Sequence, residues 1–234
     1  MTTIAIGNLK GGVGTTTLAV NLAALLQHGG HDVTLVDCSG GVEVYLWLQR
    51  RQREGLGAIR YQPSPPDASS YGDRSSYTII DAGSNRKAVL PLLPHVDIWL
   101  APTPPAFPDF MSTVTLFDFW QEARHAQSRS GMFASAIVRV DPNERALEWE
   151  ARRKLAYARQ DMLVLKQSLT RHAAWDATYS GHALHELPTH VAGSRAGEFT
   201  AMVGQFFAMG LLWLASPPRH RFIHNGQQVT AAHS

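Results

Sequence analysis

The sequence predicts an α/β protein with a doubly wound, mostly parallel sheet and helices on both of its faces. The first observation is a short apolar strand, a glycine-rich turn and an apolar-faced helix, which follow one another between Ile4 and Leu25. The second is a series of further apolar segments that alternate with helical patterns; they cover residues 33–37, 77–84, 96–101, 133–140 and 162–165. Strands that alternate with helices are typical of a parallel sheet whose ligand site lies at the carboxyl ends of the strands.

Length and composition agree with a single domain of this class. The chain has 234 residues, and we expect the domain to span residues 1–215 and a disordered tail to follow over 216–234. The formal charge of +2 is too small to indicate a nucleic-acid partner by itself. Cys38 is the only cysteine, which excludes an internal disulfide and favours a reducing, cytoplasmic location. We also expect no signal peptide, because the first strand starts almost at Met1.

The turn from Gly7 to Gly14 has the features of a phosphate-binding loop. Its backbone N–H groups would point into one concavity at the start of a helix, where the helix dipole also favours negative charge. Glycines permit positive φ values there and a close approach of phosphate oxygens to the backbone. The spacing G-x-x-x-x-G-K-[ST] is not met, however. Thr15 stands at the lysine position, Thr16 follows it, and a lysine occurs earlier, at Lys10.

The run KGGVGTTT, residues 10–17, resembles the deviant Walker A box K-G-G-x-G-K-[ST] of the ParA/MinD family of partition and cell-division ATPases. The resemblance implies the P-loop NTPase fold, binding of ATP and Mg²⁺, and a nucleotide-dependent homodimer in which Lys10 reaches the partner's nucleotide. It also assigns the Mg²⁺-coordinating hydroxyl to Thr16. The phosphates would be held by the residues of the box, which are Lys10, Gly11, Gly12, Val13, Gly14, Thr15, Thr16 and Thr17.

Thr15 is the main departure from this family pattern. A threonine hydroxyl can donate a hydrogen bond to phosphate, but it lacks the positive charge that a lysine places beside the β- and γ-phosphates. We therefore expect weakened nucleotide affinity and weak or absent ATP hydrolysis rather than loss of the site. Some ParA-like proteins linked to bacterial cellulose secretion carry the same GGVGTTT variant. Thr15 is therefore either a natural variant or an engineered substitution, and the sequence does not distinguish the two.

Two aspartates at strand ends complete the predicted site. Asp37 ends the apolar run VTLVD and matches the family aspartate that positions the attacking water, with capping of the next helix as the alternative role. Asp81 ends YTIID and has the form of a Walker B carboxylate, which holds the water shell of Mg²⁺. Ser39, Gly41 and Val138 replace a second family aspartate, a glutamine and a base-reading asparagine. These replacements weaken the predicted catalysis and base selectivity.

A helix predicted over residues 143–159 is rich in basic side chains. Its cations either form an ordinary solvated face, balanced by glutamates at i,i+4 spacing, or contact the phosphate backbone of DNA non-specifically. The resemblance supports the second interpretation, because ATPases of this family bind DNA as dimers. The candidate DNA-binding residues are Arg152, Arg153, Lys154, Arg159 and Arg171.

The last third of the chain extends the resemblance to about residue 190, where Arg171, Gly181, Glu186 and Pro188 match a late family segment. The final helix, predicted over 194–215, is apolar but interrupted by glycines, so we expect it to cover the sheet and not to insert into a membrane. The eleven histidines lack the spacing of metal ligands.

These observations favour a ParA-like nucleotide-binding switch, an ATP-dependent dimer in plasmid or cargo partition or positioning that works with an adaptor or partner protein. The alternative is a non-hydrolysing ParA-like scaffold that binds a partner protein of a secretion, conjugation or cellulose-export assembly. A metabolic P-loop enzyme is a third and weaker interpretation, since the sequence shows no insertion that would bind a small substrate.

Overall fold

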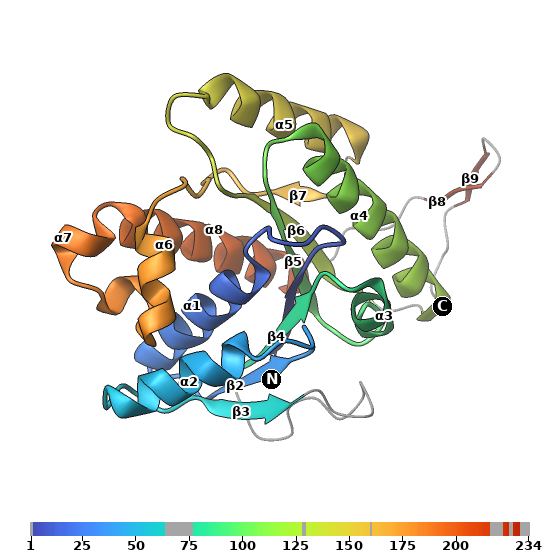
Figure 1. Ribbon diagram of the computed structural model, residues 1–234. Coiled ribbons are helices and arrows are strands. Elements are labelled where there is room, and N and C mark those ends of the chain that lie inside the picture. Colours follow the sequence, from blue (N-terminus) through green and yellow to red (C-terminus); the bar gives the residue numbers. More distant parts are fainter. Residues whose placement is uncertain are drawn as a thin grey trace.

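A seven-stranded parallel sheet forms the centre of the computed structural model, which describes residues 2–63, 77–127, 130–159, 161–215, 222–224 and 227–229 (Figure 1). The strand order is β3-β2-β4-β1-β5-β6-β7. Strand bounds are β1 (Thr2–Gly7), β2 (Val33–Asp37), β3 (Arg60–Pro63), β4 (Tyr77–Gly83), β5 (Ile98–Thr103), β6 (Met132–Ile137) and β7 (Leu163–Val164). Because β1 lies between β4 and β5, the strand order reverses beside it, and such a reversal is where ligands bind in open α/β sheets.

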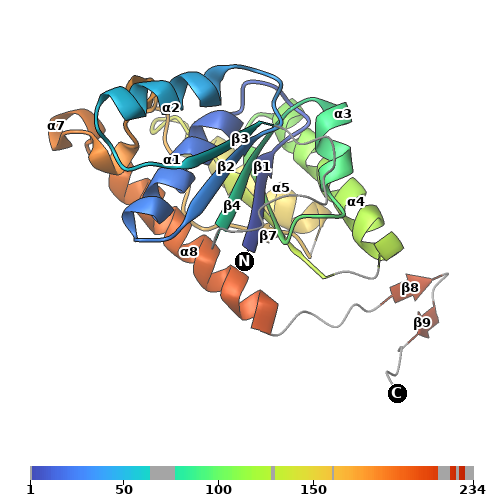
Figure 2. The same cartoon turned by 90° about the horizontal axis from the view of Figure 1, so that it is seen from below.

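Helices cover both faces of this sheet, so the predicted doubly wound α/β fold is confirmed (Figures 1 and 2). On one side lie α1 (Thr15–His28), α2 (Glu43–Arg53), α6 (Ala174–Ala177), α7 (Thr189–Ala192) and α8 (Arg195–Ala215), with the short 3₁₀ turns η3 (Thr178–Ser180) and η4 (Leu184–Glu186) between them. On the other side lie α3 (Arg86–Val89), the 3₁₀ turn η2 (Leu90–Leu92), α4 (Phe107–Gln127) and α5 (Arg145–Ala158).

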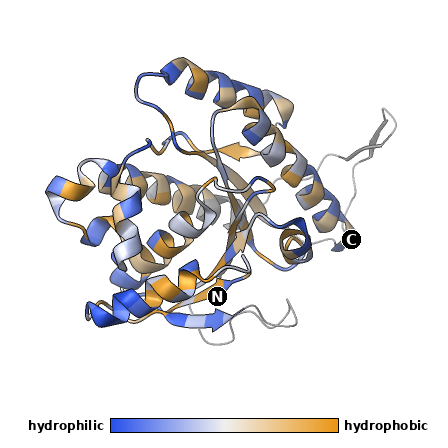
Figure 3. Ribbon diagram, viewed as in Figure 1, coloured by the Kyte–Doolittle hydropathy of each residue, from blue (hydrophilic) through white to orange (hydrophobic). Residues whose placement is uncertain are grey.

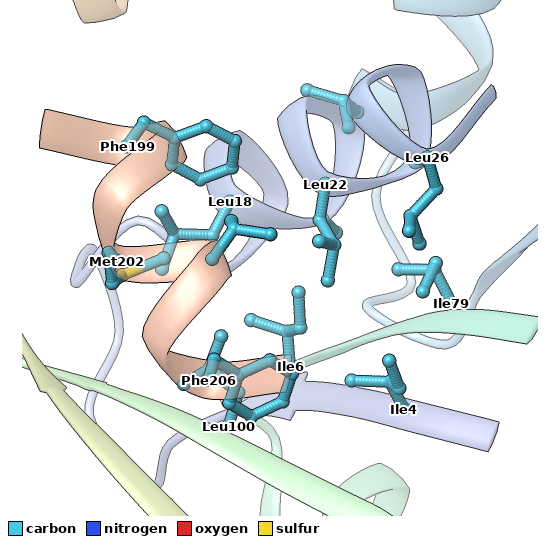
Figure 4. Close-up of a cluster of buried hydrophobic side chains, with 14 of the residues drawn as sticks. Ile4, Ile6, Leu18, Leu22, Leu26, Ile79, Leu100, Phe199, Met202 and Phe206 are labelled. Carbon is cyan, nitrogen blue, oxygen red and sulfur yellow. The ribbon is translucent and has the colours of Figure 1, made fainter. Parts of the chain in front are cut away.

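The sheet separates two apolar cores. Along β1, Ile4 and Ile6 face the core under α1 and α8, whereas Ala5 faces the core under α3, α4 and α5, as the two-residue period of a strand requires. Figure 4 shows the first core, in which Leu22 of α1 and Phe206 of α8 meet the strands. Strands apolar on both faces are typical of parallel sheets, and the polar helix surfaces point outward (Figure 3).

Strands β5 and β6 depart from their predicted bounds for local reasons. β5 starts later than predicted and runs on through Pro102; β1 pairs with it only as far as Leu100, so the missing N–H of proline falls beyond that ladder. β6 ends at Ile137 instead of Val140, because Arg139 has a φ of 58°, which interrupts the extended backbone.

The stretch 55–76, predicted as a surface loop, is only partly one. Residues 60–63 form the edge strand β3, which pairs with β2, while residues 64–76 lie outside the described residues. Most of the predicted tail also lies outside them, although the short strands β8 (Phe222–His224) and β9 (Gln227–Val229) pair antiparallel within it. No helix in the described part of the chain combines the length and apolar character needed to cross a membrane.

Candidate functional site

The glycine-rich loop leaves the carboxyl end of β1 and leads directly into α1. Gly12 and Gly14 have φ values of 74° and 96°, in the left-handed region that glycine adopts without steric cost. Gly14 is the N-cap of α1, and no acidic side chain lies in the first turn of this helix. Its free N–H groups and its dipole therefore meet an anion without competition from a neighbouring carboxylate.

Asn8 fixes the start of the loop to the neighbouring elements. Its side chain is fully buried and donates to the Pro102 carbonyl and to the Thr113 hydroxyl, both at 2.8 Å. Its amide oxygen accepts from the Leu9 N–H at 2.7 Å and from the Ser112 hydroxyl at 2.8 Å. The loop is thus anchored to β5 and α4 before it reaches its first left-handed glycine.

The predicted Mg²⁺ residues lie against each other beneath the loop. The Thr16 hydroxyl donates to a carboxylate oxygen of Asp81 at 2.5 Å, and the other oxygen of Asp81 accepts from the Gly83 N–H at 3.1 Å. Burial raises the pKa of Asp81 to about 6, although hydrogen bonds from Thr16, Gly83 and Thr15 act to lower it. A cation beside Asp81 would favour the charged carboxylate and so offset this effect of burial.

The second predicted aspartate, Asp37, is engaged within its own turn. One carboxylate oxygen accepts from both the N–H and the hydroxyl of Ser39, at 2.9 and 2.7 Å. Asp37 pairs in register with Asp81 across the two strands, so both carboxylates lie at the same edge of the sheet. Gly83, with a φ of 62°, lets β4 pass the turn closely, since a Cβ there would lie 2.9 Å from the Cα of Ser39.

A cavity of about 940 Å³ opens over the loop and the start of α1, and its size suits a nucleotide. Its remaining walls come from the turn after β2, the end of β4, the end of β6 and the segment around α6. The described lining residues are Gly12–Leu18, Ser39–Gly41, Glu43, Gly83, Ser84, Val138, Arg139, Leu169–Ala173, Trp175, Asp176 and Tyr179. Val138, which the resemblance puts at the base-reading position, lies in this wall.

The structure brings together most of the predicted box but not all of it. Thr15, Thr16 and Thr17 line the cavity, whereas Lys10 is exposed, lies outside the described lining, and makes no hydrogen bond or ion pair within the described chain. An outward Lys10 is free to meet another molecule. Cys38, between Asp37 and Ser39 in the sequence, is buried.

Sequence reasoning overlooked Arg139 and Tyr179. Arg139 donates to the Gly12 carbonyl of the loop at 2.8 Å, and the Tyr179 hydroxyl lies 3.5 Å from that of Thr17. The only signal for Arg139 was its position beside Val138, and Tyr179 carried none.

The five candidate DNA-binding residues do not share one surface. Arg171 lines the cavity, while the other four belong to α5 or its end. The α5 cations are mostly engaged: Arg152 donates to Glu148, Ser168 and the Leu165 carbonyl, Lys154 pairs with Glu150, Arg159 binds both oxygens of Asp118, and Arg153 stacks over Trp149.

Comparisons with known proteins agree with this geometry. Residues 1–44 match the family model described as an AAA domain. No curated protein sequence matches the chain. Among solved structures, apo McdA from Cyanothece is similar over 88% of this chain and 99% of its own, with a TM-score of 0.70 and 16% identity. The septum site-determining protein MinD of Pyrococcus horikoshii, complexed with Mg-ADP, covers 89% and 98%, with a TM-score of 0.64 and 15% identity.

A third similar structure is a putative plasmid partition protein of Borrelia burgdorferi bound to AMPPNP, which covers 89% of this chain and 99% of its own at a TM-score of 0.63 and 14% identity. At these identities the similarity establishes the fold. The resemblance that the sequence indicated therefore extends to the fold shared with McdA, MinD and the partition protein, and the family-model match covers the glycine-rich loop.

Proposed function

We propose that this protein is a ParA-like positioning protein that binds ATP and Mg²⁺ in the cavity above the glycine-rich loop and dimerises in the ATP-bound state. The observation that carries the proposal is the contact between Thr16 and Asp81 directly beneath a loop with two left-handed glycines. Hydroxyl and carboxylate oxygens are the ligands that Mg²⁺ prefers, and the N–H groups at the start of α1 suit phosphate.

Each group of the chain has a distinct task in this proposal. The loop from Gly11 to Thr17 binds the phosphates, and Thr16 and Asp81 hold Mg²⁺, which supplies positive charge next to them. Lys10, exposed at the edge of the loop, reaches the second copy of the chain. The ligands of the similar structures support nucleotide binding, since these structures include complexes with ATP, AMPPNP and Mg-ADP.

Slow hydrolysis is part of the same proposal. Thr15 leaves the site without the lysine charge, and Asp37 already accepts two hydrogen bonds from Ser39. These bonds engage one oxygen of Asp37, and the other oxygen has no partner among the described residues, so it stays available for the water-orienting role that the family resemblance gives Asp37. Slow hydrolysis therefore rests on the missing lysine charge. The bound state would then be long-lived.

The scaffold alternative rests on the same observation. If the missing lysine charge at Thr15 keeps the site from hydrolysing ATP, the protein acts through its surfaces, and binding of a partner protein becomes its function. One of the similar structures is a MinC:MinD complex from Aquifex aeolicus, which shows a partner bound to this fold. Contact with DNA is a subordinate proposal, because the α5 cations that would make it are largely paired within the chain.

Calorimetry with ATP and Mg²⁺, combined with light scattering for mass, tests the proposal. The wild-type chain is expected to bind ATP and to dimerise, with Thr15→Lys binding more tightly and Thr16→Val losing the dependence on Mg²⁺. Thr115→Val, which removes an exposed hydroxyl of α4 far along the sequence from the loop, is the matched control. Absence of ATP binding at millimolar concentration in both the wild type and Thr15→Lys would refute a nucleotide-binding function.

A further inference from the structure

The cavity is lined by positively charged side chains that are not part of the Walker A pattern. Among the described residues that line it, the cations are Arg139 and Arg171, and the carboxylates are Glu43 and Asp176. Of the two arginines, Arg139 contacts the glycine-rich loop itself, because its guanidinium donates to the Gly12 carbonyl at 2.8 Å. A cation therefore lies at the loop even though Thr15 does not provide one.

The backbone of Arg139 is held in an unfavourable conformation. Its φ of 58° makes it the one non-glycine residue with a positive φ in the described part of the chain. The residues on both sides are fixed: the Val138 N–H donates to the Thr103 carbonyl and the Val140 N–H to the Leu169 carbonyl, at 3.1 Å each. Left-handed arginine is disfavoured sterically and persists where surrounding structure enforces it, as is common at binding sites.

The side chain has capacity beyond this one contact. Arginine carries five N–H donors in a planar fork and stays charged at every physiological pH. One donor is used on Gly12, and the side chain is exposed with no further partner in the described chain. The remaining donors match the geometry of phosphate oxygens, for which the arginine fork is especially suited.

We propose that Arg139 is the phosphate-directed cation of this site and supplies the charge that a lysine at position 15 would otherwise provide. The inference rests on the proposed nucleotide-binding function and specifies how the site tolerates Thr15. Arg139 follows the end of β6, which lies on the other side of β1 from β2 in the sheet order. The charge would thus come from a different strand from the one that leads into the loop.

Arg139→Asn is the decisive variant, because asparagine accepts a positive φ and removes the charge while keeping the backbone. We expect calorimetry to show ATP affinity reduced about 10-fold or more, as for loss of a charge-assisted phosphate contact. AMP affinity should change much less, since its single phosphate lacks the β- and γ-groups. Arg139→Lys should retain most of the preference for ATP over AMP, and Thr15→Lys combined with Arg139→Asn should restore it.

Arg53→Asn is the matched control, since it removes an exposed arginine in the last turn of α2, outside this cavity and without a role in the proposed function. Unchanged ATP affinity in Arg139→Asn, or an equal loss for ATP and AMP, would overturn the role of Arg139 while leaving the nucleotide site in place. If the wild type binds no nucleotide at all, the proposed function itself fails, and the role of Arg139 with it.

Discussion

Removing Glu186 is expected to destabilise the protein strongly, because it leaves a buried cation unpaired. The side chain of Arg51 is only 2% exposed, and its guanidinium makes two bonds to Glu186, at 2.7 and 2.8 Å. Further donors of Arg51 reach the carbonyls of Gly57 and Gly181 and the side chain of Gln27. These contacts join α2 to the segment before α7, across 135 residues of sequence.

The size of the effect follows from this burial. Breaking a buried ion pair by removing one partner costs about 3–5 kcal/mol, because the other charge stays desolvated. At about 2–4 °C per kcal/mol for a domain of this size, Glu186→Ala should lower the melting temperature by roughly 6–20 °C. The lost hydrogen bond from the Ala183 N–H acts in the same direction.

Urea unfolding followed by circular dichroism measures this difference. Glu150→Ala is the control, because Glu150 forms an exposed pair with Lys154 on α5 and its removal should leave the midpoint unchanged. Arg51→Met combined with Glu186→Leu should recover much of the loss, since no charge is then buried. A loss below about 1 kcal/mol in Glu186→Ala would show that Arg51 does not depend on this carboxylate for its burial.

Two further predictions concern the backbone and the pH dependence. Gly83→Ala should lower the free energy of unfolding by about 1–3 kcal/mol, because the φ of Gly83 is 62° and a Cβ there would meet Ser39. Gly204→Ala, on the exposed face of α8, should instead raise it by about 0.5–1 kcal/mol. Equal unfolding midpoints for the two variants would contradict both expectations. Burial lowers the pKa of His185; the charge of Glu186 opposes this effect, whereas His28 and Arg51 add to it. As the pH falls below about 6.5, His185 therefore takes up a proton more readily in the unfolded chain than in the folded one, and the free energy of unfolding decreases. The wild type should therefore lose more stability than His185→Phe between pH 7.5 and 5.5 in urea titrations, and parallel losses would exclude His185 as the cause.

Much of the fold could be predicted from the sequence where local pattern and tertiary environment agree. The run VTLVD predicted β2 with its observed bounds, because a buried parallel strand is rich in apolar and β-branched residues and a carboxylate stands at its end. The glycine-rich loop was found for a similar reason, since few backbone conformations other than left-handed turns require glycine so densely.

Features that depend on distant partners could not be predicted in this way. Arg51 lies in a helix rich in arginine, and nothing in that sequence distinguishes the buried side chain from its exposed neighbours. Strand β3 has a polar composition with a proline, which is tolerated because it pairs with β2 at the sheet edge and is largely exposed. The contact between Arg139 and Gly12 depends on the register of three strands, which local patterns do not encode.

The separation of the two cores by the sheet has a consequence for how substitutions combine. Side chains under α8 and side chains under α4 do not share neighbours, so losses of packing on opposite faces should add independently. The central strands contribute to both cores, and in β1 Ile6 belongs to one core and Ala5 to the other, just before the loop begins. The side chains of the helices on each face can therefore change without affecting the other core, whereas substitutions in β1, which carries the loop, are constrained by the packing of both cores.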